Sequence, residues 1–187
     1  MSLYLLDRDG VVIVNRATNV KTPDELALLP GVPEAIARLN GAGFDVAICT
    51  NQPEVARGVI SQEQLDVTHE ALRQMLAARG ATVDFTLCCG YDHKSPRRKP
   101  SGGMLREALA RYGANPAETP FVGDQVDDLK AAFHAGCRRV LVRTGLGRKT
   151  LEQGLPQYLS PVAVHADLAE VVDAQLGGKL ARCPASP

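Results

Sequence analysis

The sequence predicts an α/β protein in which helices cover both faces of a Rossmann-like parallel sheet, with no large cap domain. Short, apolar strand-like segments alternate with amphipathic helical segments along most of the chain. Apolar runs of this kind are typical of strands that are buried on both faces. The intervals between the polar strand ends hold single loops, helices and strands, which leaves no room for an inserted lid.

The elements follow from local patterns taken in chain order. The apolar run LYLL at 3–6 predicts a short buried strand, and FDVAICT at 44–50 predicts the next one. The clearest helix covers 61–80, because Ser61 and Gln64 fit a capping box, apolar residues repeat at helical spacing and a glycine ends it. The remaining elements are helices at 33–43, 104–113 and 126–136, strands at 83–89, 119–124 and 138–145, and a last strand and helix within 162–176.

The composition is that of one globular domain, which we expect to cover 1–176, with a flexible tail at 177–187. Lys+Arg and Asp+Glu both total 21, so charge gives no reason to expect a nucleic-acid or membrane partner. No apolar run approaches the roughly 18 residues of a membrane-spanning helix, and the apolar start lacks a basic leader. We therefore expect a cytoplasmic protein and, since heptads are absent, a monomer.

The five cysteines form no framework of regular spacing. Cys49, Cys88 and Cys89 lie in apolar, strand-like runs. In the expected compartment, cysteines at such positions behave as small buried hydrophobes. We therefore expect reduced thiols in preference to disulfides.

Asp7 and Asp9 end the first predicted strand. Residues two apart on an extended chain project to the same side, so both carboxylates can approach one small site. Like charges this close repel each other unless a cation or a proton intervenes. Mg²⁺ meets this requirement, because it binds one or two carboxylates and completes its shell with water and substrate phosphate. A solvated Asp-Gly turn is the alternative interpretation.

A second acidic group follows the strand predicted at 119–124. Asp124 comes directly after a glycine, and Asp128 lies one helical turn later, so the two carboxylates can share a face. Asp124 is the candidate third metal ligand, and Asp128 is a candidate to orient it or a metal-bound water. Asp127 is expected to face solvent, where the electrostatics of a helix N-terminus explain it.

Two further groups at element ends can receive phosphate. Thr50, Asn51 and Gln52 end a buried strand, where a hydroxyl and free backbone N–H groups can bind an anion. Arg98 and Lys99 precede a helix, where cations are unfavourable for the helix dipole unless an anion is present. Lys99 can neutralise phosphoryl oxygens, while Arg98 can bind a second anion bidentately. A polar strand end and a solvated basic loop are the alternatives.

Taken together, these motifs resemble those of the haloacid-dehalogenase-type phosphatases. That family has a strand ending in D-x-D-G, a second strand ending in Thr or Ser, a basic residue before a helix, and G-D-x-x-x-D after a later strand. The corresponding motifs occur here in the same order, as DRDG at 7–10, Thr50, Lys99 and GDQVDD at 123–128. The resemblance covers most of the chain.

The resemblance implies a Mg²⁺-dependent phosphatase that works through an aspartyl-phosphate. It makes Asp7 the nucleophile and Asp9 the general acid and then base. The metal would be held by the Asp7 carboxylate, the Asp9 backbone carbonyl and Asp124. Thr50 and Lys99 would stabilise the transferring phosphoryl group.

Within the family, the motifs are most similar to those of enzymes acting on heptose bisphosphate or on histidinol phosphate, with the C7 phosphate of the heptose as the leading expectation. A non-catalytic phosphosugar-binding protein is a third hypothesis. The first loop reads NRAT where the heptose enzymes carry an acidic-His-Gly-Tyr-like run. The resemblance implies substrate contacts at Asn15, Arg16, Thr18, Asn51, Gln52, Pro53, Arg98 and Gln125.

Many relatives also carry a structural zinc loop, with Cys-x-His and a later Cys-x-Cys. Here Cys88, Cys89 and His93 offer at most three ligands, whereas a structural zinc site needs four. We therefore expect Mg²⁺ as the cofactor and no structural zinc.

Overall fold

The computed structural model describes residues 2–90 and 95–177, and these form an α/β fold around one parallel sheet. Its strands are β1 Ser2–Leu6, β2 Phe44–Asn51, β3 Phe85–Cys89, β4 Pro120–Gly123, β5 Arg138–Val142 and β6 Ala163–His165. They lie in the order β3-β2-β1-β4-β5-β6, and every neighbouring pair is parallel. The predicted fold class is therefore confirmed.

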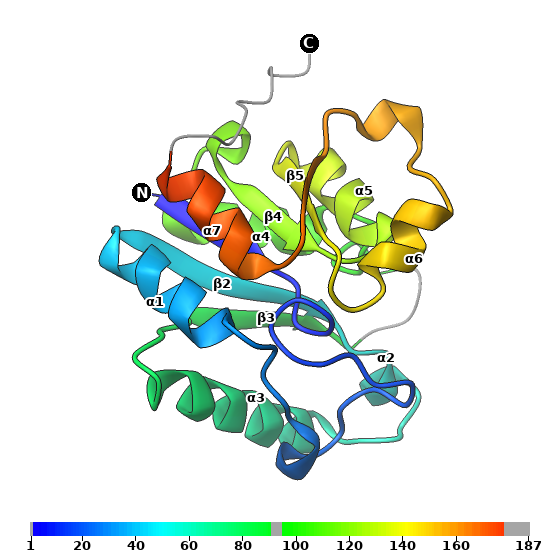
Figure 1. Ribbon diagram of the computed structural model, residues 1–187. Helices are drawn as coiled ribbons and strands as arrows, with labels where there is room; N and C mark the ends of the chain where they lie inside the picture. The colour runs from blue at the N-terminus through cyan, green and yellow to red at the C-terminus, as the bar shows by residue number, and fades with distance from the viewer. Residues whose placement is uncertain (1, 91–94, 178–187) are drawn as a thin grey trace.

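Helices cover both faces of this sheet, as Figure 1 shows. The face with α1 Val32–Gly41, α3 Gln62–Ala77 and α7 Leu168–Leu176 is opposite the face with α4 Gly103–Tyr112 and α5 Val126–Ala135. The shorter elements are α2 Pro53–Ala56, α6 Gly147–Glu152 and the 3₁₀ helices Pro23–Glu25, Pro116–Glu118 and Gln157–Leu159. No large cap domain is inserted in the described part of the chain.

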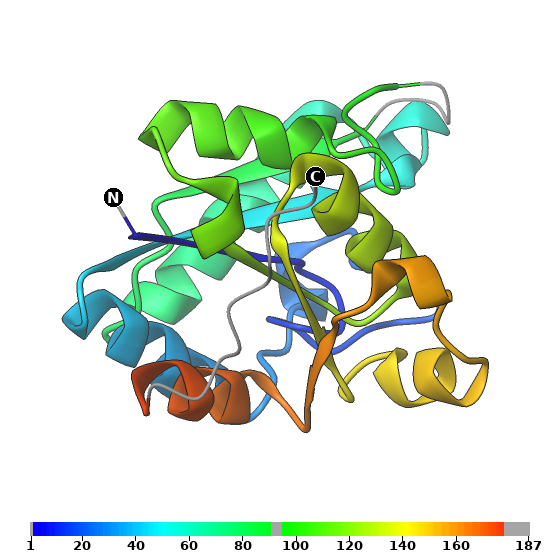
Figure 2. The same cartoon turned by 90° about the horizontal axis from the view of Figure 1, so that it is seen from above.

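The core consists of two apolar layers separated by the sheet. Figure 2 shows the helices that lie on either side of the sheet. Side chains alternate along a strand, so Tyr4 and Leu6 pack with α1 and α7, while Leu3 and Leu5 pack with α4 and α5. Because both faces of β1 are buried in this way, its sequence is apolar at every position from 3 to 6.

Most predicted elements are confirmed within a few residues. The capping box of α3 is present, with the Ser61 hydroxyl accepting from the Gln64 N–H at 3.1 Å. The short helices α2 and α6 were not predicted, because neither is long enough to repeat an apolar pattern.

The remaining expectations concern the cysteines, membrane helices, His93 and the chain end. Cys49, Cys88, Cys89 and Cys137 carry free thiols, as expected. Within 2–90 and 95–177, no helix has both the length and the apolar character needed to cross a membrane. His93 and the predicted tail beyond Gly177 lie outside the described residues.

The strand order places a topological switch point at β1. The chain runs outward from β1 through β2 to β3, and then returns to β4 on the other side of β1. In parallel sheets, ligands bind beyond the carboxyl ends of the strands at such a point. The predicted motifs at Asp7 and Asp124 follow β1 and β4 directly, so both lie at this position.

Candidate active site

Asp7, Asp124 and Asp128 form a buried cluster of carboxylates at the switch point. Their nearest carboxylate oxygens all lie within 4.8 Å of one another. Asp7 follows β1 and donates its backbone N–H to Val122 O at 2.8 Å, which ties it to β4. Asp128 comes from the first turn of α5. Residues far apart in the chain are therefore brought together, as the sequence predicted.

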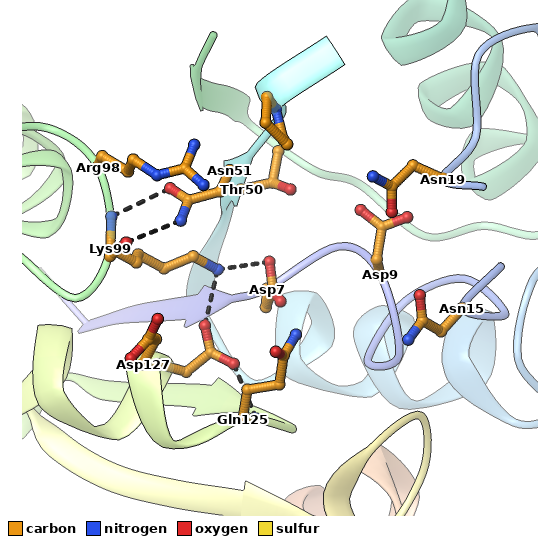
Figure 3. Close-up of a pocket in the computed structure, with 12 residues that line it drawn as sticks. Asp7, Asp9, Asn15, Asn19, Thr50, Asn51, Arg98, Lys99, Gln125 and Asp127 are labelled. Atoms are coloured by element: carbon orange, nitrogen blue, oxygen red, sulfur yellow. Dashed lines mark hydrogen bonds and ion pairs between the residues drawn. The ribbon is translucent and has the colours of Figure 1, made fainter. Parts of the chain in front are cut away.

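Lys99 bridges two members of this cluster, Asp7 and Asp128, and is 4 % exposed. Its Nζ is 2.7 Å from Asp7 Oδ1 and 2.7 Å from Asp128 Oδ1 (Figure 3). The Asn51 side chain fixes the backbone of Lys99, accepting from its N–H at 3.0 Å and donating to its carbonyl at 2.9 Å. Asn51 thus positions the ammonium against the acidic cluster.

Three buried carboxylates face a single ammonium in this cluster, and the pKa values reflect that excess of negative charge. Burial is the main cause that raises the pKa of Asp7 to about 8; Lys99 opposes it, while Asp128 and Asp124 add to it. Burial and Asp128 raise the pKa of Asp124 to about 7. Burial alone would lower the pKa of Lys99. The negative charges of Asp128 and Asp7 outweigh that effect, so the pKa of Lys99 is raised. A divalent cation would relieve the repulsion.

The Asp124 carboxylate has the environment expected of a metal ligand. Its Oδ2 accepts from the Leu146 N–H at 2.7 Å, while its buried Oδ1 has no hydrogen-bond partner among the described residues. A Cβ on Gly10 or Gly145 would lie 2.1 or 2.2 Å from Oδ2, so both positions must lack a side chain. The residues present fit a hard cation, which prefers carboxylate oxygen.

The Asp9 carboxylate does not belong to this cluster, which corrects the prediction that both strand-end carboxylates share one cation site. Instead it accepts from Arg8 Nε at 3.0 Å and from Gln52 Nε2 at 3.0 Å. The physical reason is that β1 ends at Leu6, so the extended geometry that places alternate residues on one side no longer applies. Asp9 nevertheless lines the same pocket as Asp7.

Arg8 and His69 support Asp9 and were not predicted from the sequence. Arg8 is fully buried, and its Nη2 also donates to Gln52 Oε1 at 2.9 Å. His69, on α3, lies with Nε2 3.2 Å from Arg8 Nη1. The only signal was a charged residue enclosed between apolar and acidic neighbours at the end of a buried strand.

A polar pocket of about 230 Å³ lies above the cluster. Of the predicted substrate residues, Asn15, Asn51, Pro53, Arg98 and Gln125 line it, together with Thr50, Asp9 and Lys99, and so do the rim residue Asp127 and the unpredicted Asn19. Figure 3 shows these side chains arranged around Asp7.

Three predicted substrate residues do not line this pocket. Arg16 and Thr18 are exposed and are not among the residues that line it. Gln52 is 1 % exposed and lies beneath the floor, where its Nε2 donates to Thr50 Oγ1 at 2.9 Å as well as to Asp9. Gln52 therefore orients two pocket residues from below.

Comparison with known proteins shows the family to which the chain belongs. A family model described as HAD-hyrolase-like matches residues 96–171, and curated phosphatases match nearly the whole chain. The chain belongs to the haloacid-dehalogenase-type phosphatases, which are phosphoric monoester hydrolases.

The relatives within this class carry a particular name. The D-glycero-beta-D-manno-heptose-1,7-bisphosphate 7-phosphatase of Bordetella bronchiseptica is 44% identical over 176 residues, covering 92% of this chain and 97% of the relative. The enzyme of that name from Pseudomonas aeruginosa is 41% identical, covering 94% and 98%. A crystal structure of the D,D-heptose 1,7-bisphosphate phosphatase from B. bronchiseptica, complexed with magnesium and phosphate, superposes with a TM-score of 0.90 at 43% identity, covering 95% of this chain and 99% of that one.

Proposed function

We propose that this enzyme is a magnesium-dependent phosphatase that removes the C7 phosphate of D-glycero-D-manno-heptose 1,7-bisphosphate, in the synthesis of nucleotide-activated heptose. The observation that carries the reaction type is the contact of Lys99 with Asp7 beside Thr50 and the acidic cluster. The names of the relatives support the substrate. We expect the reaction to take place in the cytoplasm and the enzyme to act as a monomer.

Asp7 is the proposed nucleophile. Its carboxylate lies at the pocket floor, where an oxygen can attack phosphorus and form an aspartyl-phosphate. Lys99 and Thr50 border the same floor and are the proposed donors to the phosphoryl oxygens. Phosphoryl transfer depends mainly on such positioning and charge neutralisation.

Asp9 is the proposed general acid and base. It lines the pocket beside Asp7, so it can protonate the leaving sugar oxygen and afterwards take a proton from the attacking water. Arg8 and Gln52 hold both of its oxygens in one orientation. A fixed orientation matters because proton transfer requires hydrogen-bond reach.

Mg²⁺ is the proposed cofactor, held by the carboxylates of Asp7 and Asp124 and by the backbone carbonyl of Asp9. The partnerless Oδ1 of Asp124 and the surplus of buried carboxylate support this assignment. When bound, the ion supplies positive charge that favours attack on the phosphate. Asp128 supports the site from α5, accepting from the Asp124 and Gln125 N–H groups at 3.2 and 3.0 Å.

The second phosphate of the substrate is assigned to Arg98. This side chain lines the pocket next to Lys99, and a guanidinium suits bidentate binding of phosphate. Asn15 and Gln125 on the other walls are the proposed contacts to sugar hydroxyls.

The proposal is tested by the rate of phosphate release with Mg²⁺ present. We expect kcat/KM for the heptose bisphosphate to exceed that for histidinol phosphate, and Asp7→Asn to reduce release by at least about 10³-fold, because the nucleophile is lost while volume is kept. A clear preference for histidinol phosphate would overturn the substrate assignment. Equal release by Asp7→Asn and the unchanged protein would overturn the mechanism.

A further inference from the structure

Asn19 has a backbone conformation that sets it apart. Its φ of 53° makes it the one residue other than glycine with positive φ among the described ranges 2–90 and 95–177. Asn tolerates the left-handed region better than most residues, yet the conformation is still sparsely populated. Such outliers persist where the surrounding structure over-determines them, and they gather at ligand sites.

A hydrogen bond to a buried carboxylate fixes the orientation of the Asn19 side chain. Asn19 Nδ2 donates to Glu54 Oε1 at 2.5 Å, and Glu54, in α2, is 5 % exposed. Arg57 Nη1 is 3.7 Å from the same oxygen. The other oxygen, Oε2, is buried with no hydrogen-bond partner among the described residues. The bond to Asn19 is therefore the main hydrogen bond that Glu54 accepts.

This contact decides which amide atom Asn19 offers to a ligand. A carboxylate only accepts hydrogen bonds, so the amide atom beside Glu54 must be the NH₂ group. The remaining atom, Oδ1, is an acceptor. Asn19 lines the pocket, so Oδ1 is the atom of its amide that can accept a hydrogen bond from a ligand hydroxyl there.

The place of Asn19 in the pocket determines which part of a substrate it meets. In Figure 3, Asn15 and Asn19 flank Asp9, on the side of Asp7 that is away from Lys99 and Arg98. The phosphoryl group is proposed to lie with Lys99, and Asp9 must reach the oxygen that leaves. Atoms next to that oxygen therefore lie beside Asn19.

We propose that Asn19, held by Glu54, is a specificity-determining residue that accepts a hydrogen bond from a hydroxyl on the carbon next to the phosphoester carbon. The substrate class is thus a phosphate ester of a vicinal diol, as in a sugar or polyol chain. This inference rests on the proposed function, since it takes Asp9 to act beside the leaving oxygen. Asn19 touches the substrate in this account, and Glu54 acts through Asn19 as a positioning residue.

The test compares two esters that differ by that one hydroxyl, 2-hydroxyethyl phosphate and ethyl phosphate, with Mg²⁺ present. The unchanged enzyme is expected to have a kcat/KM about three- to tenfold higher for the first, the range of one neutral hydrogen bond. In Asn19→Gly, which tolerates positive φ but lacks the amide, the ratio of the two values should fall to about one.

Two variants of Glu54 separate positioning from folding. Glu54→Gln still offers an oxygen to Asn19 and should keep the ratio, whereas Glu54→Leu offers none and should lose it. Thermal unfolding confirms that each variant is folded. A ratio near one in the unchanged enzyme, or an undiminished ratio in folded Asn19→Gly, would overturn the inference. Hydrolysis of heptose bisphosphate is measured separately. The result for the proposed function is therefore independent of the result for the preference between the two esters.

Discussion

His69 does not line the pocket but acts on it through Arg8. The His69 ring contacts the Arg8 guanidinium, which in turn donates to the Asp9 carboxylate. Burial and Arg8 lower the pKa of His69 to about 4. The ring is therefore neutral near pH 7, and an unprotonated Nε2 accepts from Arg8 Nη1. His69 thus contributes an acceptor rather than a charge, and this directs the guanidinium toward Asp9 and Gln52.

Replacing His69 tests this chain of contacts. His69→Leu leaves a buried Arg8 N–H without a partner, and we expect kcat on alkyl phosphates to fall about tenfold, equivalent to roughly 1–1.5 kcal/mol. The loss should be smaller for p-nitrophenyl phosphate, because its leaving group needs no proton. His69→Gln, which restores an acceptor, should recover most of the rate. Equal losses for both substrates in steady-state assays would point to a general loss of structure instead.

The residues of the site divide into those that sequence could and could not reveal. Asp7, Asp124 and Lys99 stand at predicted element ends, where their charge made them candidates, and the order of the family motifs then singled them out. Arg8 contacts a histidine 61 positions away and Asn19 contacts a glutamate 35 positions away. Pairs of this kind depend on how α2 and α3 pack, which no local pattern records.

The segment from the end of β5 through α6 fixes the candidate metal ligand. Thr150 Oγ1 donates to the Asp124 backbone carbonyl at 2.8 Å, Leu146 N–H donates to its carboxylate, and Thr144 Oγ1 donates to Gly10 O at 2.6 Å. The sequence predicted only a strand ending near Gly145, since a six-residue helix is too short for a periodic signal. The structure shows that Thr150 and Leu146 together hold Asp124, and we call these two hydrogen bonds the clamp on Asp124.

Thr150→Val should loosen this clamp, because it keeps the shape of the side chain and removes the donor. We expect about three- to tenfold weaker Mg²⁺ binding, the effect of one lost hydrogen bond. Thr150→Ser keeps the hydroxyl and is the matched control. Isothermal titration with Mg²⁺ measures both variants, and an unchanged affinity in Thr150→Val would show that the clamp does not orient the ligand.

The start of α3 is an element that the sequence described correctly, and its capping box makes a stability prediction. Ser61→Ala removes the acceptor for the Gln64 N–H and should cost about 1 kcal/mol. For a chain of this size that lowers Tm by about 2–4 °C. Ser61→Asp keeps an acceptor and should retain most of the stability. A Tm for Ser61→Ala within error of the unchanged protein would contradict the assignment.

At the scale of the whole molecule, the apolar core and the acidic cluster contribute to stability in opposite directions. The two apolar layers bury both faces of the sheet. The sequence predicted this, because strands buried on both faces are apolar at nearly every position. The acidic cluster acts against stability: burial raises the pKa values of Asp7 and Asp124, so ionising them costs folding free energy. A cation bound to the ionised carboxylates would offset this cost, because it relieves the repulsion between them.

Stability should therefore fall as pH rises without Mg²⁺ and depend much less on pH with excess Mg²⁺ bound. Both carboxyl groups have folded-state pKa values, about 8 for Asp7 and about 7 for Asp124, above the ordinary value of 3.8. Their contribution to stability is full below that ordinary value and is lost as pH rises through about 7 to 8. Mg²⁺ requires the ionised form, so the rise in Tm on adding excess Mg²⁺ should grow over the same interval.

Thermal unfolding between about pH 5 and pH 9 measures this linkage. Asp124→Asn is the informative variant, because it removes one buried charge and one candidate ligand together. Without metal it should unfold at a higher temperature than the unchanged protein near pH 8, since repulsion within the cluster falls. With Mg²⁺ its Tm should rise far less. A rise in Tm that is equal in both proteins, or that does not grow with pH, would mean that the cation binds elsewhere.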